Sequence, residues 1–464
     1  MHRILASLIL VVWVAFPVFA QDITGDWQGI LKAGPQEFHM VLHIAKEEKG
    51  GFTGTLDSIE NNAFGIPLSS ISIQDSNLRF AMDISQAKYE GYVDAAAESI
   101  QGTWLQANQS FPMGFKRQTV AWDRSVAGAE QGTFELVSDE REVTFEFSGD
   151  TFYGTLLIPE NARGKAPGVL LLSGSGPTDR DGNSSLLPGK TESHKNFARI
   201  LADAGVASLR YDKYGTGKTG LGSYARKLTS LTFDTYVDLA LAAYHYLGNR
   251  PEIDPERLAI LGHSEGGLIA LVATDRMKTE IPPVALILAA SASKPYMTLL
   301  RDQIAAQYES AVKAKAYTRR QADDGMAELD GIIAQVQRDA TVPKKISPHF
   351  AKLFSPPNLR FLQTAHRYDP RKLAANLPAN MGILVLCGSK DSQCPCSSEK
   401  LLADAFEQGG HNGMRFVKLA NVNHVFKEVE GVPNPATDYT DPAKPFSHEA
   451  ERVITDFIET TLLP

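Results

Sequence analysis

The amino-acid sequence predicts a small all-β domain followed by a larger α/β domain built on a mostly parallel sheet. Three observations carry this prediction. Residues 22–118 alternate apolar and polar side chains with the period of two that half-buried strands show. Beyond about residue 135, short apolar runs alternate with helical patterns, as in sheets covered on both faces. Between residues 291 and 381 this alternation stops, which predicts a helical insertion.

Length and composition exclude several protein classes. The 464 residues hold 46 Lys and Arg against 54 Asp and Glu, a formal net charge of −8. Such a length predicts two or three domains. Three cysteines are too few for a disulfide scaffold, and 37 Gly with 25 Pro exclude a collagen-like chain. Because the charge is acidic and no basic block occurs, we expect no nucleic-acid partner.

Residues 1–20 have the layout of a secretory signal peptide. His2 and Arg3 form a positive end, an apolar run follows, and the small residues Val18 and Ala20 favour cleavage after Ala20. An uncleaved membrane anchor is the alternative, although the run is short for a span and no basic stop-transfer cluster follows it. We therefore expect a periplasmic or secreted protein with no membrane span after cleavage.

The predicted N-terminal domain, residues 22–118, contains regularly alternating strand patterns. The inward-facing positions are expected to be Phe38, Met40, Leu42, Ile44, Leu78, Phe80, Met82 and Ile84. Two Gly-x-Trp units, at residues 25–27 and 102–104, bracket the domain and suggest strands that meet and close a small barrel or sandwich. Residues 119–134 are expected to be a linker.

Residues 135–464 predict the α/β domain. Its expected strands are Glu142–Phe147, Phe152–Ile158, Gly168–Leu172, Val206–Arg210, Leu258–Leu261, Val284–Ala289, Gly382–Leu386 and Arg415–Leu419. One apolar helical face between two of these strands comprises Phe233, Tyr236, Val237, Ala240, Leu241 and Tyr244. A last helix is expected over Ser447–Thr461. Within the 291–381 insertion, Met297–Ala314 and Arg320–Val336 look helical, and their place after a strand predicts a lid over the ligand site.

The strongest chemical motif is Gly262-His263-Ser264-Glu265-Gly266, a G-x-S-x-G pattern between a strand and a helix-compatible segment. This context predicts a sharp turn that exposes Ser264 as a nucleophile. In an α/β-hydrolase an acid and then a histidine must follow, on loops after later strands. Asp391 and His424 occupy those places, so we expect His424 to be the base and Asp391 to orient it. An aspartate of another loop is the alternative acid.

Backbone N–H groups near the nucleophile predict an oxyanion hole. One donor is expected to be the N–H of Glu265, at the start of the helix. The second is expected from the Gly-rich loop Ser173–Pro177, which follows the domain's third strand. The N–H of Ser175 is the first choice and that of Gly174 the second. Two such donors supply a few kcal/mol each to the transition state.

Other motifs are weaker. Cys387, Cys394 and Cys396 have poor spacing for zinc and no histidine nearby, so a disulfide of Cys387 with Cys394 or Cys396 is favoured over a metal site. The segment 215–219, Gly-Thr-Gly-Lys-Thr, lacks phosphate-loop spacing. Asp212 and Lys213 before it are expected to be structural. We therefore expect no metal and no cofactor.

Beyond about residue 135 the chain resembles secreted bacterial α/β-hydrolases of an esterase and acylaminoacyl-peptidase-like branch. The resemblance lies in residues 173–183, SGSGPTDRDGN, and 209–217, LRYDKYGTG, with Tyr214 where that branch usually has Arg. The acidic Glu265 after the nucleophile also fits. The β-rich domain resembles those found ahead of such hydrolases. The resemblance implies a serine hydrolase acting on esters.

Three functions follow from these observations. The first is a carboxylic ester hydrolase that forms an acyl-enzyme on Ser264. The second is a serine peptidase with the same triad, in which Glu265 could hold a substrate terminus. The third is a binding protein with an idle hydrolase fold. The intact Ser, Asp, His and Gly-rich loop favour an enzyme, and its substrate is expected to be a small ester or a peptide.

Overall fold

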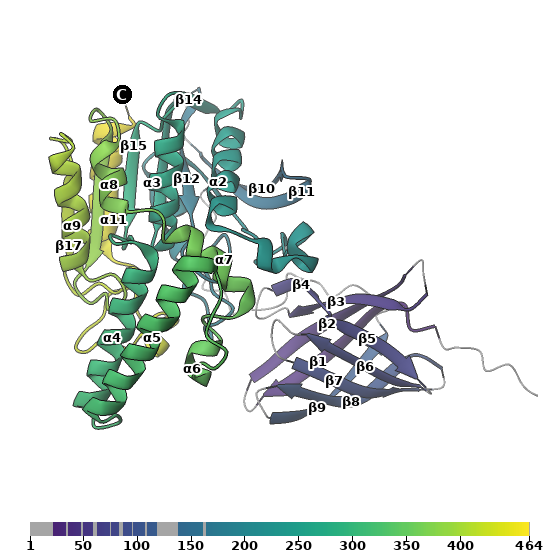
Figure 1. The fold of residues 1–464 in the computed structure, drawn as a ribbon. Helices are drawn as coiled ribbons and strands as arrows, with labels where there is room; N and C mark the ends of the chain where they lie inside the picture. Colours follow the sequence, from purple (N-terminus) through teal and green to yellow (C-terminus); the bar gives the residue numbers. More distant parts are fainter. Residues whose placement is uncertain are drawn as a thin grey trace, which may run out of the picture. The chain divides into compact units, whose positions relative to one another are not determined.

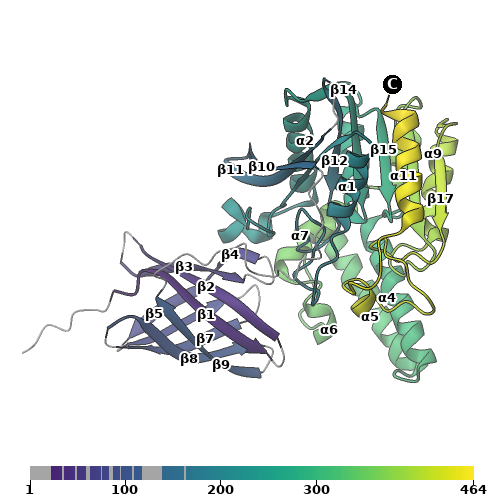
Figure 2. The same cartoon turned by 180° about the vertical axis from the view of Figure 1, so that it is seen from behind.

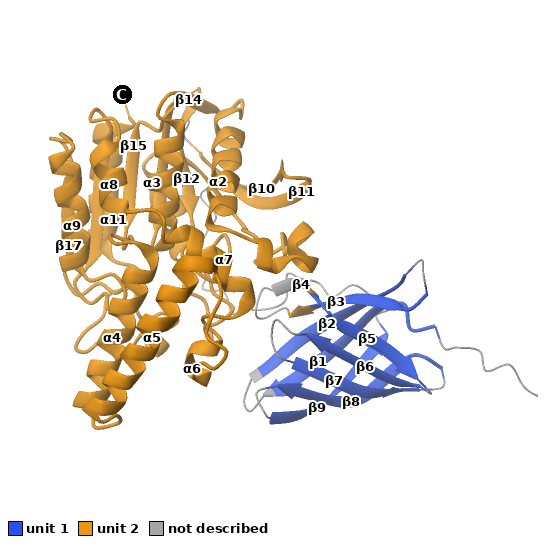
Figure 3. Cartoon of the chain, viewed as in Figure 1, with its two compact units in different colours: residues 1–56, 67–123 blue, residues 57–66, 124–464 orange. Residues whose placement is uncertain are grey.

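The computed structural model describes residues 22–33, 36–47, 50–58, 63–74, 76–82, 87–94, 96–106, 109–117, 138–160 and 164–463. The predicted signal peptide, residues 1–20, and the predicted linker, residues 119–134, lie outside these ranges. The chain divides into two compact units, residues 1–56 with 67–123 and residues 57–66 with 124–464 (Figure 3).

The N-terminal sheet is nine-stranded, in the order β4-β3-β2-β1-β9-β8-β7-β6-β5 (Figure 1). Its strands are β1 Gly25–Ala33, β2 Gln36–Lys46, β3 Phe52–Ser58, β4 Ala63–Pro67, β5 Ser70–Gln74, β6 Asn77–Met82, β7 Ala87–Val93, β8 Ser99–Gln106 and β9 Gln109–Arg117. Aromatic side chains fill its core, among them Trp27, Tyr89, Trp104 and Phe115. The two Gly-x-Trp units lie on β1 and β8, and β9 runs between these strands, so the units are not direct neighbours.

The second unit contains an eight-stranded sheet in the order β10-β11-β13-β12-β14-β15-β16-β17. Its strands are β10 Ser138–Phe147, β11 Asp150–Pro159, β12 Ala166–Leu172, β13 Ala207–Tyr211, β14 Ile253–His263, β15 Ala285–Ala289, β16 Gly382–Gly388 and β17 Arg415–Leu419. The first two strands pair antiparallel, and β11 also pairs antiparallel with β13. The pairings from β13 through β12 to β17 are parallel.

Helices cover both faces of this sheet (Figures 1 and 2). They are α1 Ser193–Asp203, α2 Phe233–Gly248, α3 Glu265–Met277, α8 Pro370–Asn376, α9 Cys396–Gln408 and α11 His448–Thr461. Smaller pieces are η1 Gly222–Arg226, η2 Leu228–Ser230 and α10 Pro435–Asp438. Side chains of α2, α3, α8 and α9 pack into one core with the sheet, and those of α1 and α11 into the other. The predicted apolar face of α2 is part of the first core.

The predicted insertion is helical. Between β15 and β16 the chain forms α4 Tyr296–Lys313, α5 Arg319–Asp339, α6 Pro348–Ala351, α7 Pro356–Ala365 and then α8. In Figure 1, α4 and α5 form a long pair that projects away from the sheet. Residues of α4 to α7 build a hydrophobic cluster of their own, which includes Tyr308, Leu329, Ile332, Phe350 and Phe354. Part of the insertion therefore forms a hydrophobic cluster of its own, while Ala365 of α7 and Ala374 of α8 belong to the first core of the sheet.

Candidate active site

Ser264 occupies the turn between the end of β14 and the start of α3. Its φ of 57° and ψ of −120° are a conformation that a non-glycine residue adopts only where the surrounding packing imposes it. Neighbouring glycines make the turn possible. An added Cβ at Gly262 would lie 2.4 Å from the carbonyl oxygen of Gly266, and one at Gly266 would lie 2.1 Å from that of Leu172. The turn presents the Ser264 hydroxyl beyond the carboxyl end of β14.

The structure brings Ser264, His424 and Asp391 together. His424 Nε2 lies 3.1 Å from Ser264 Oγ, and His424 Nδ1 lies 2.8 Å from Asp391 Oδ2. His424 and Asp391 are both buried. Because a carboxylate can only accept hydrogen bonds, Asp391 accepts one from the Nδ1–H group of His424. The Nε2 atom then carries no proton and can receive the one from Ser264. The three groups form one hydrogen-bonded chain.

The loop after β16 fixes Asp391. Its Oδ1 accepts the backbone N–H groups of Gln393 at 2.7 Å and Cys394 at 2.9 Å, so Oδ2 remains for His424. A disulfide joins Cys387, near the end of β16, to Cys396, at the start of α9, with Cα atoms 5.3 Å apart. It encloses the Asp391 loop. Cys394, the other partner considered from the sequence, is a buried free cysteine.

The loop after β17 fixes His424 from its backbone. The side-chain oxygen of Asn423 accepts two backbone N–H groups, at 3.1 and 3.0 Å. His263 Nε2 donates to the carbonyl oxygen of His424 at 2.8 Å. Burial, with smaller contributions from His424 and His194, holds the pKa of His263 well below its usual value, so this imidazole is neutral. The sequence motif predicts no role for His263, and its place beside Ser264 is the one local signal of such a role.

The expected oxyanion donors lie near Ser264. An added Cβ on Gly174 would be 3.2 Å from Ser264 Cβ and 3.6 Å from its Oγ, so this backbone runs directly beside the hydroxyl. Thr178 Oγ1 donates to the carbonyl oxygen of Ser175 at 2.9 Å and holds the loop. Among the described residues, the backbone N–H groups of Gly174, Ser175 and Glu265 have no acceptor. They are available to an oxygen at the site.

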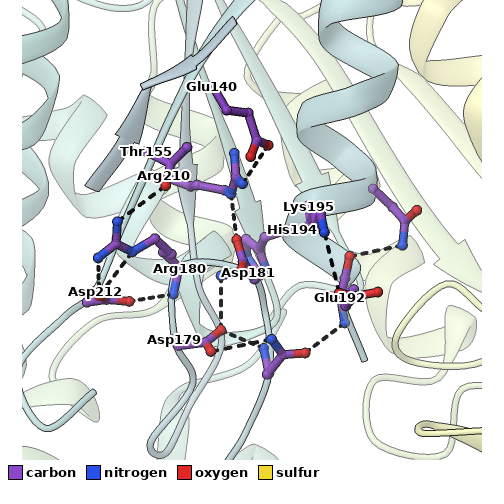
Figure 4. Close-up of polar contacts among 12 residues, drawn as sticks. Glu140, Thr155, Asp179, Arg180, Asp181, Glu192, His194, Lys195, Arg210 and Asp212 are labelled. Atoms are coloured by element: carbon purple, nitrogen blue, oxygen red, sulfur yellow. Dashed lines mark hydrogen bonds and ion pairs between the residues drawn. The ribbon is translucent and has the colours of Figure 1, made fainter. Parts of the chain in front are cut away.

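A network of ion pairs anchors the rest of this loop (Figure 4). The Arg180 side chain donates two hydrogen bonds to Asp212 Oδ2, from Nε at 3.0 Å and from Nη2 at 2.6 Å. Its backbone N–H donates to Oδ1 of the same carboxylate at 3.0 Å. Arg210 Nε donates to Asp181 at 2.8 Å, and its Nη2 donates to Glu140 at 2.9 Å. The segment that follows the oxyanion loop is thereby tied to β13 and β10 by largely buried charges.

The side chain of Glu265 is buried beside the nucleophile. Tyr296 OH, from α4, donates to its Oε2 at 2.7 Å, and Lys213 Nζ lies 3.9 Å from its Oε1. Burial raises the pKa of Glu265, an effect that Lys213 and Tyr296 oppose. This carboxyl group is therefore already engaged within the protein.

The Gly-rich segment 215–219 packs around the carboxyl group of Asp212. An added Cβ on Gly217 would lie 2.2 Å from the Asp212 carboxyl group, and Lys218 N–H donates to Asp212 Oδ2 at 3.1 Å.

Within the described ranges, no group of three or more His, Cys, Asp or Glu side chains could hold a metal ion. Among the helices of the described chain, none has the length and apolarity to cross a bilayer.

Solved structures with similar backbones include Est1E, a second esterase and a peptidase. Est1E from Butyrivibrio proteoclasticus has 14% identity, a TM-score of 0.41 and a match over 70% of this chain and 99% of its own. An esterase from Pyrococcus furiosus has 13% identity, a TM-score of 0.44, and covers 70% and 92%. Proline iminopeptidase from Mycobacterium smegmatis has 18% identity, a TM-score of 0.45, and covers 70% and 99%. These likenesses are too distant for any property to be transferred from them.

A family model gives the assignment. No curated protein sequence matches the chain. The Hydrolase_4 model, described as serine aminopeptidase, S33, matches residues 187–421, just over half of the chain. The match includes Ser264 and Asp391 and ends three residues before His424. The chain therefore belongs to the Hydrolase_4 family of α/β-hydrolases.

Proposed function

We propose that this protein is a serine hydrolase that cleaves carboxylic esters through an acyl-enzyme intermediate. The observation that carries the proposal is the hydrogen-bonded chain from Ser264 Oγ through His424 to Asp391, with distances of 3.1 and 2.8 Å. The strained turn that exposes Ser264 and the unpaired N–H groups beside it support the same reading. Nucleophile, base, orienting acid and oxyanion donors are then all supplied by this chain.

The steps follow from the geometry. His424 Nε2 takes the Ser264 proton as Oγ bonds to the acyl carbon, and the N–H groups of Glu265 and Ser175, or of Gly174, bind the oxyanion. When the intermediate collapses, His424 gives that proton to the leaving alcohol. Water then loses a proton to His424, attacks the acyl-enzyme and releases the acid, while Ser264 regains its proton. Asp391 stabilises the imidazolium in both halves.

Amide cleavage by the same triad is the second candidate, favoured by the family description, serine aminopeptidase. A peptidase must also place its substrate well, because His424 has to protonate a poor amine leaving group. Glu265 was the residue that could hold a substrate terminus. Since Tyr296 and Lys213 already face this carboxyl group, the ester reading is preferred.

We also propose a periplasmic or secreted location. The support comes from the layout of residues 1–20 and from the disulfide of Cys387 with Cys396, a bond that persists in oxidising compartments. The branch of secreted hydrolases with a β-rich N-terminal domain, suggested by the motifs, fits this location. For the helical insertion we propose the function of a lid that shapes the acyl or alcohol pocket.

The test compares the wild type with Ser264→Ala on two substrate sets. One set is p-nitrophenyl esters of rising acyl length, and the other is aminoacyl p-nitroanilides. We expect rapid ester turnover, negligible anilide cleavage, and a loss of kcat in Ser264→Ala of about 10⁶-fold, as for removal of a serine nucleophile. Ser310→Ala is the matched control, because Ser310 is exposed in the last turn of α4.

Each outcome has one meaning. Comparable anilide cleavage that also depends on Ser264 would show that the protein is a peptidase and not mainly an ester hydrolase. Ester turnover that survives in Ser264→Ala would remove the triad from the mechanism. If neither substrate set is cleaved, a fluorophosphonate probe distinguishes the remaining possibilities. Labelling of Ser264 would show that the protein is a serine hydrolase with a different substrate. An unlabelled Ser264 would support a binding protein with an inactive hydrolase fold.

A further inference from the structure

Lys213 is a buried lysine behind the loop that runs beside Ser264. It follows β13, it is 5% exposed, and its Nζ donates a short hydrogen bond to the carbonyl oxygen of Gly174. Two other groups face this ammonium group: Glu265 Oε1 at 3.9 Å and the ring of Tyr236, whose centroid is 5.7 Å away. A lysine this far from water needs a specific reason to be there.

The hydrogen bond acts on a peptide unit of the site. The described residues contain no cis peptide bond, so the Gly174 carbonyl and the Ser175 N–H point in opposite directions from one planar unit. A donor that holds the carbonyl on one side therefore fixes the direction of the N–H on the other. The same glycine lies beside the nucleophile, since an added Cβ would be 3.6 Å from Ser264 Oγ.

We propose that Lys213 is a positioning residue: it holds the Gly174 carbonyl and so aims the Ser175 N–H at the oxygen that becomes negative during acyl transfer. The inference rests on the proposed function. Oxyanion donors stabilise the transition state because they are aimed before the reaction begins. Without the ammonium group the peptide unit is free to rotate, and part of that stabilisation is lost.

Glu265 and Tyr296 hold the Lys213 side chain in its place. An isolated buried ammonium group is costly, and the Glu265 carboxyl group supplies its counter-charge. The hydroxyl of Tyr296, the first residue of α4, holds Glu265 in place at 2.7 Å. A chain of three side chains thus connects the start of the helical insertion to the carbonyl behind the oxyanion loop. From the sequence Lys213 is expected to be structural, because a contact over 39 residues leaves no local pattern.

Lys213→Met tests the inference, because methionine keeps the length of the side chain and removes its donor. We expect kcat on a p-nitrophenyl ester to fall about 10- to 100-fold, less than the 10²- to 10³-fold that follows removal of a donor itself. KM should stay within about twofold, and the inhibition constant of a trifluoromethyl ketone, which forms an oxyanion on Ser264, should rise by the same factor as kcat falls. Lys218→Met is the matched control, because the ammonium group of this exposed lysine pairs with Glu142 at the surface.

A charge-balanced variant, Lys213→Met with Glu265→Gln, separates positioning from charge compensation. It leaves no unpaired buried charge, so we expect it to unfold at a temperature near that of the wild type while kcat stays low. Recovery of kcat in the double variant, or an unchanged kcat in folded Lys213→Met, overturns the role of Lys213. Turnover that does not depend on Ser264 overturns the proposed function instead, and the Ser264→Ala comparison shows which of the two has failed.

Discussion

At the scale of single residues, Asp391 is held through its side chain, and His424 and Ser264 are held through their backbones. Two backbone N–H groups restrict Asp391, and the His263 imidazole restricts the backbone of His424. The backbone of Ser264 is restricted by its own N–H, which donates to the carbonyl oxygen of Ala289 at 3.0 Å. Groups that are fixed before substrate arrives lose little entropy in the reaction, which is the main advantage of such a site.

Asp391→Asn tests the orienting acid. Asparagine keeps the shape of the side chain, but its amide can donate to Nδ1 and so favours the imidazole tautomer that cannot accept the Ser264 proton. We expect kcat to fall about 10³- to 10⁴-fold with little change in KM. Steady-state kinetics on a p-nitrophenyl ester measure both constants.

The control for this variant is Asp404→Asn, an aspartate on α9 that forms a surface ion pair with Lys400. It should leave kcat unchanged. A loss of less than about tenfold in Asp391→Asn would show that another carboxyl group orients His424.

The sequence was sufficient for the residues that carry recognisable motifs, and insufficient for those that act through distant contacts. Ser264, Asp391 and His424 follow strands in the required order, so their meeting could be expected. His263 touches a carbonyl 161 residues away, and Lys213 one 39 residues away. Such contacts depend on how the strands are ordered in the sheet, which no local pattern records.

At the scale of elements, the junction of β16 and α9 concentrates the constraints on Asp391. The disulfide closes the short ring from Cys387 to Cys396 around it, a sequence separation of 9. The chain-entropy model assigns such a ring about 2–3 kcal/mol of stability. The sequence left two partners open for Cys387, because Cys394 and Cys396 differ by only two positions and the start of α9 decides between them.

Cys387→Ser with Cys396→Ser tests this junction. We expect the free energy of unfolding to fall by about 2–3 kcal/mol, and kcat to fall by up to about 100-fold as the Asp391 loop loosens. Urea denaturation and ester kinetics measure the two effects. Cys394→Ala keeps the disulfide and serves as the control. If the double serine variant matches the wild type in kcat, the backbone hydrogen bonds alone hold Asp391.

Element boundaries show what apolar patterns do and do not reveal. The predicted segments Gly382–Leu386 and Arg415–Leu419 agree with β16 and β17 to within two residues. The segment Leu258–Leu261 is only the apolar part of β14, which begins at Ile253. The charged residues between Ile253 and Leu258 have no apolar pattern that would predict a strand. Their place in β14 follows from the pairing of Ile253 with Ala166 on β12.

At the scale of the whole α/β unit, two cores on opposite faces of the sheet leave several polar groups fully enclosed. His194, at the start of α1, is 1% exposed. Burial lowers its pKa from 6.5 to about 4. In the unfolded chain, the His194 side chain therefore binds a proton below about pH 6.5. In the folded chain, it binds that proton only below about pH 4. This histidine contributes stability above pH 6.5 that is lost as the pH falls toward 4.

His194→Gln removes that titration. Between pH 7.5 and pH 5 we expect the free energy of unfolding of the wild type to fall by about 2 kcal/mol more than that of the variant. Denaturation in urea at the two pH values measures the difference, and other titrating groups cancel in the comparison. His448→Gln, which alters a histidine on the surface, should behave as the wild type does. Equal losses in the wild type and His194→Gln would show that His194 titrates normally in the folded protein.

The separate hydrophobic cluster of the insertion has a consequence for how this enzyme can diversify. Because Leu329 belongs to the cluster within the insertion and to neither core of the sheet, a substitution there is absorbed inside the insertion and leaves the two cores intact. Evolution can therefore change this cluster while the residues around Ser264 are inherited unchanged. Tyr296 differs from Leu329, since its hydroxyl reaches Glu265, and selection at that position must satisfy both the insertion and the surroundings of Ser264 at once.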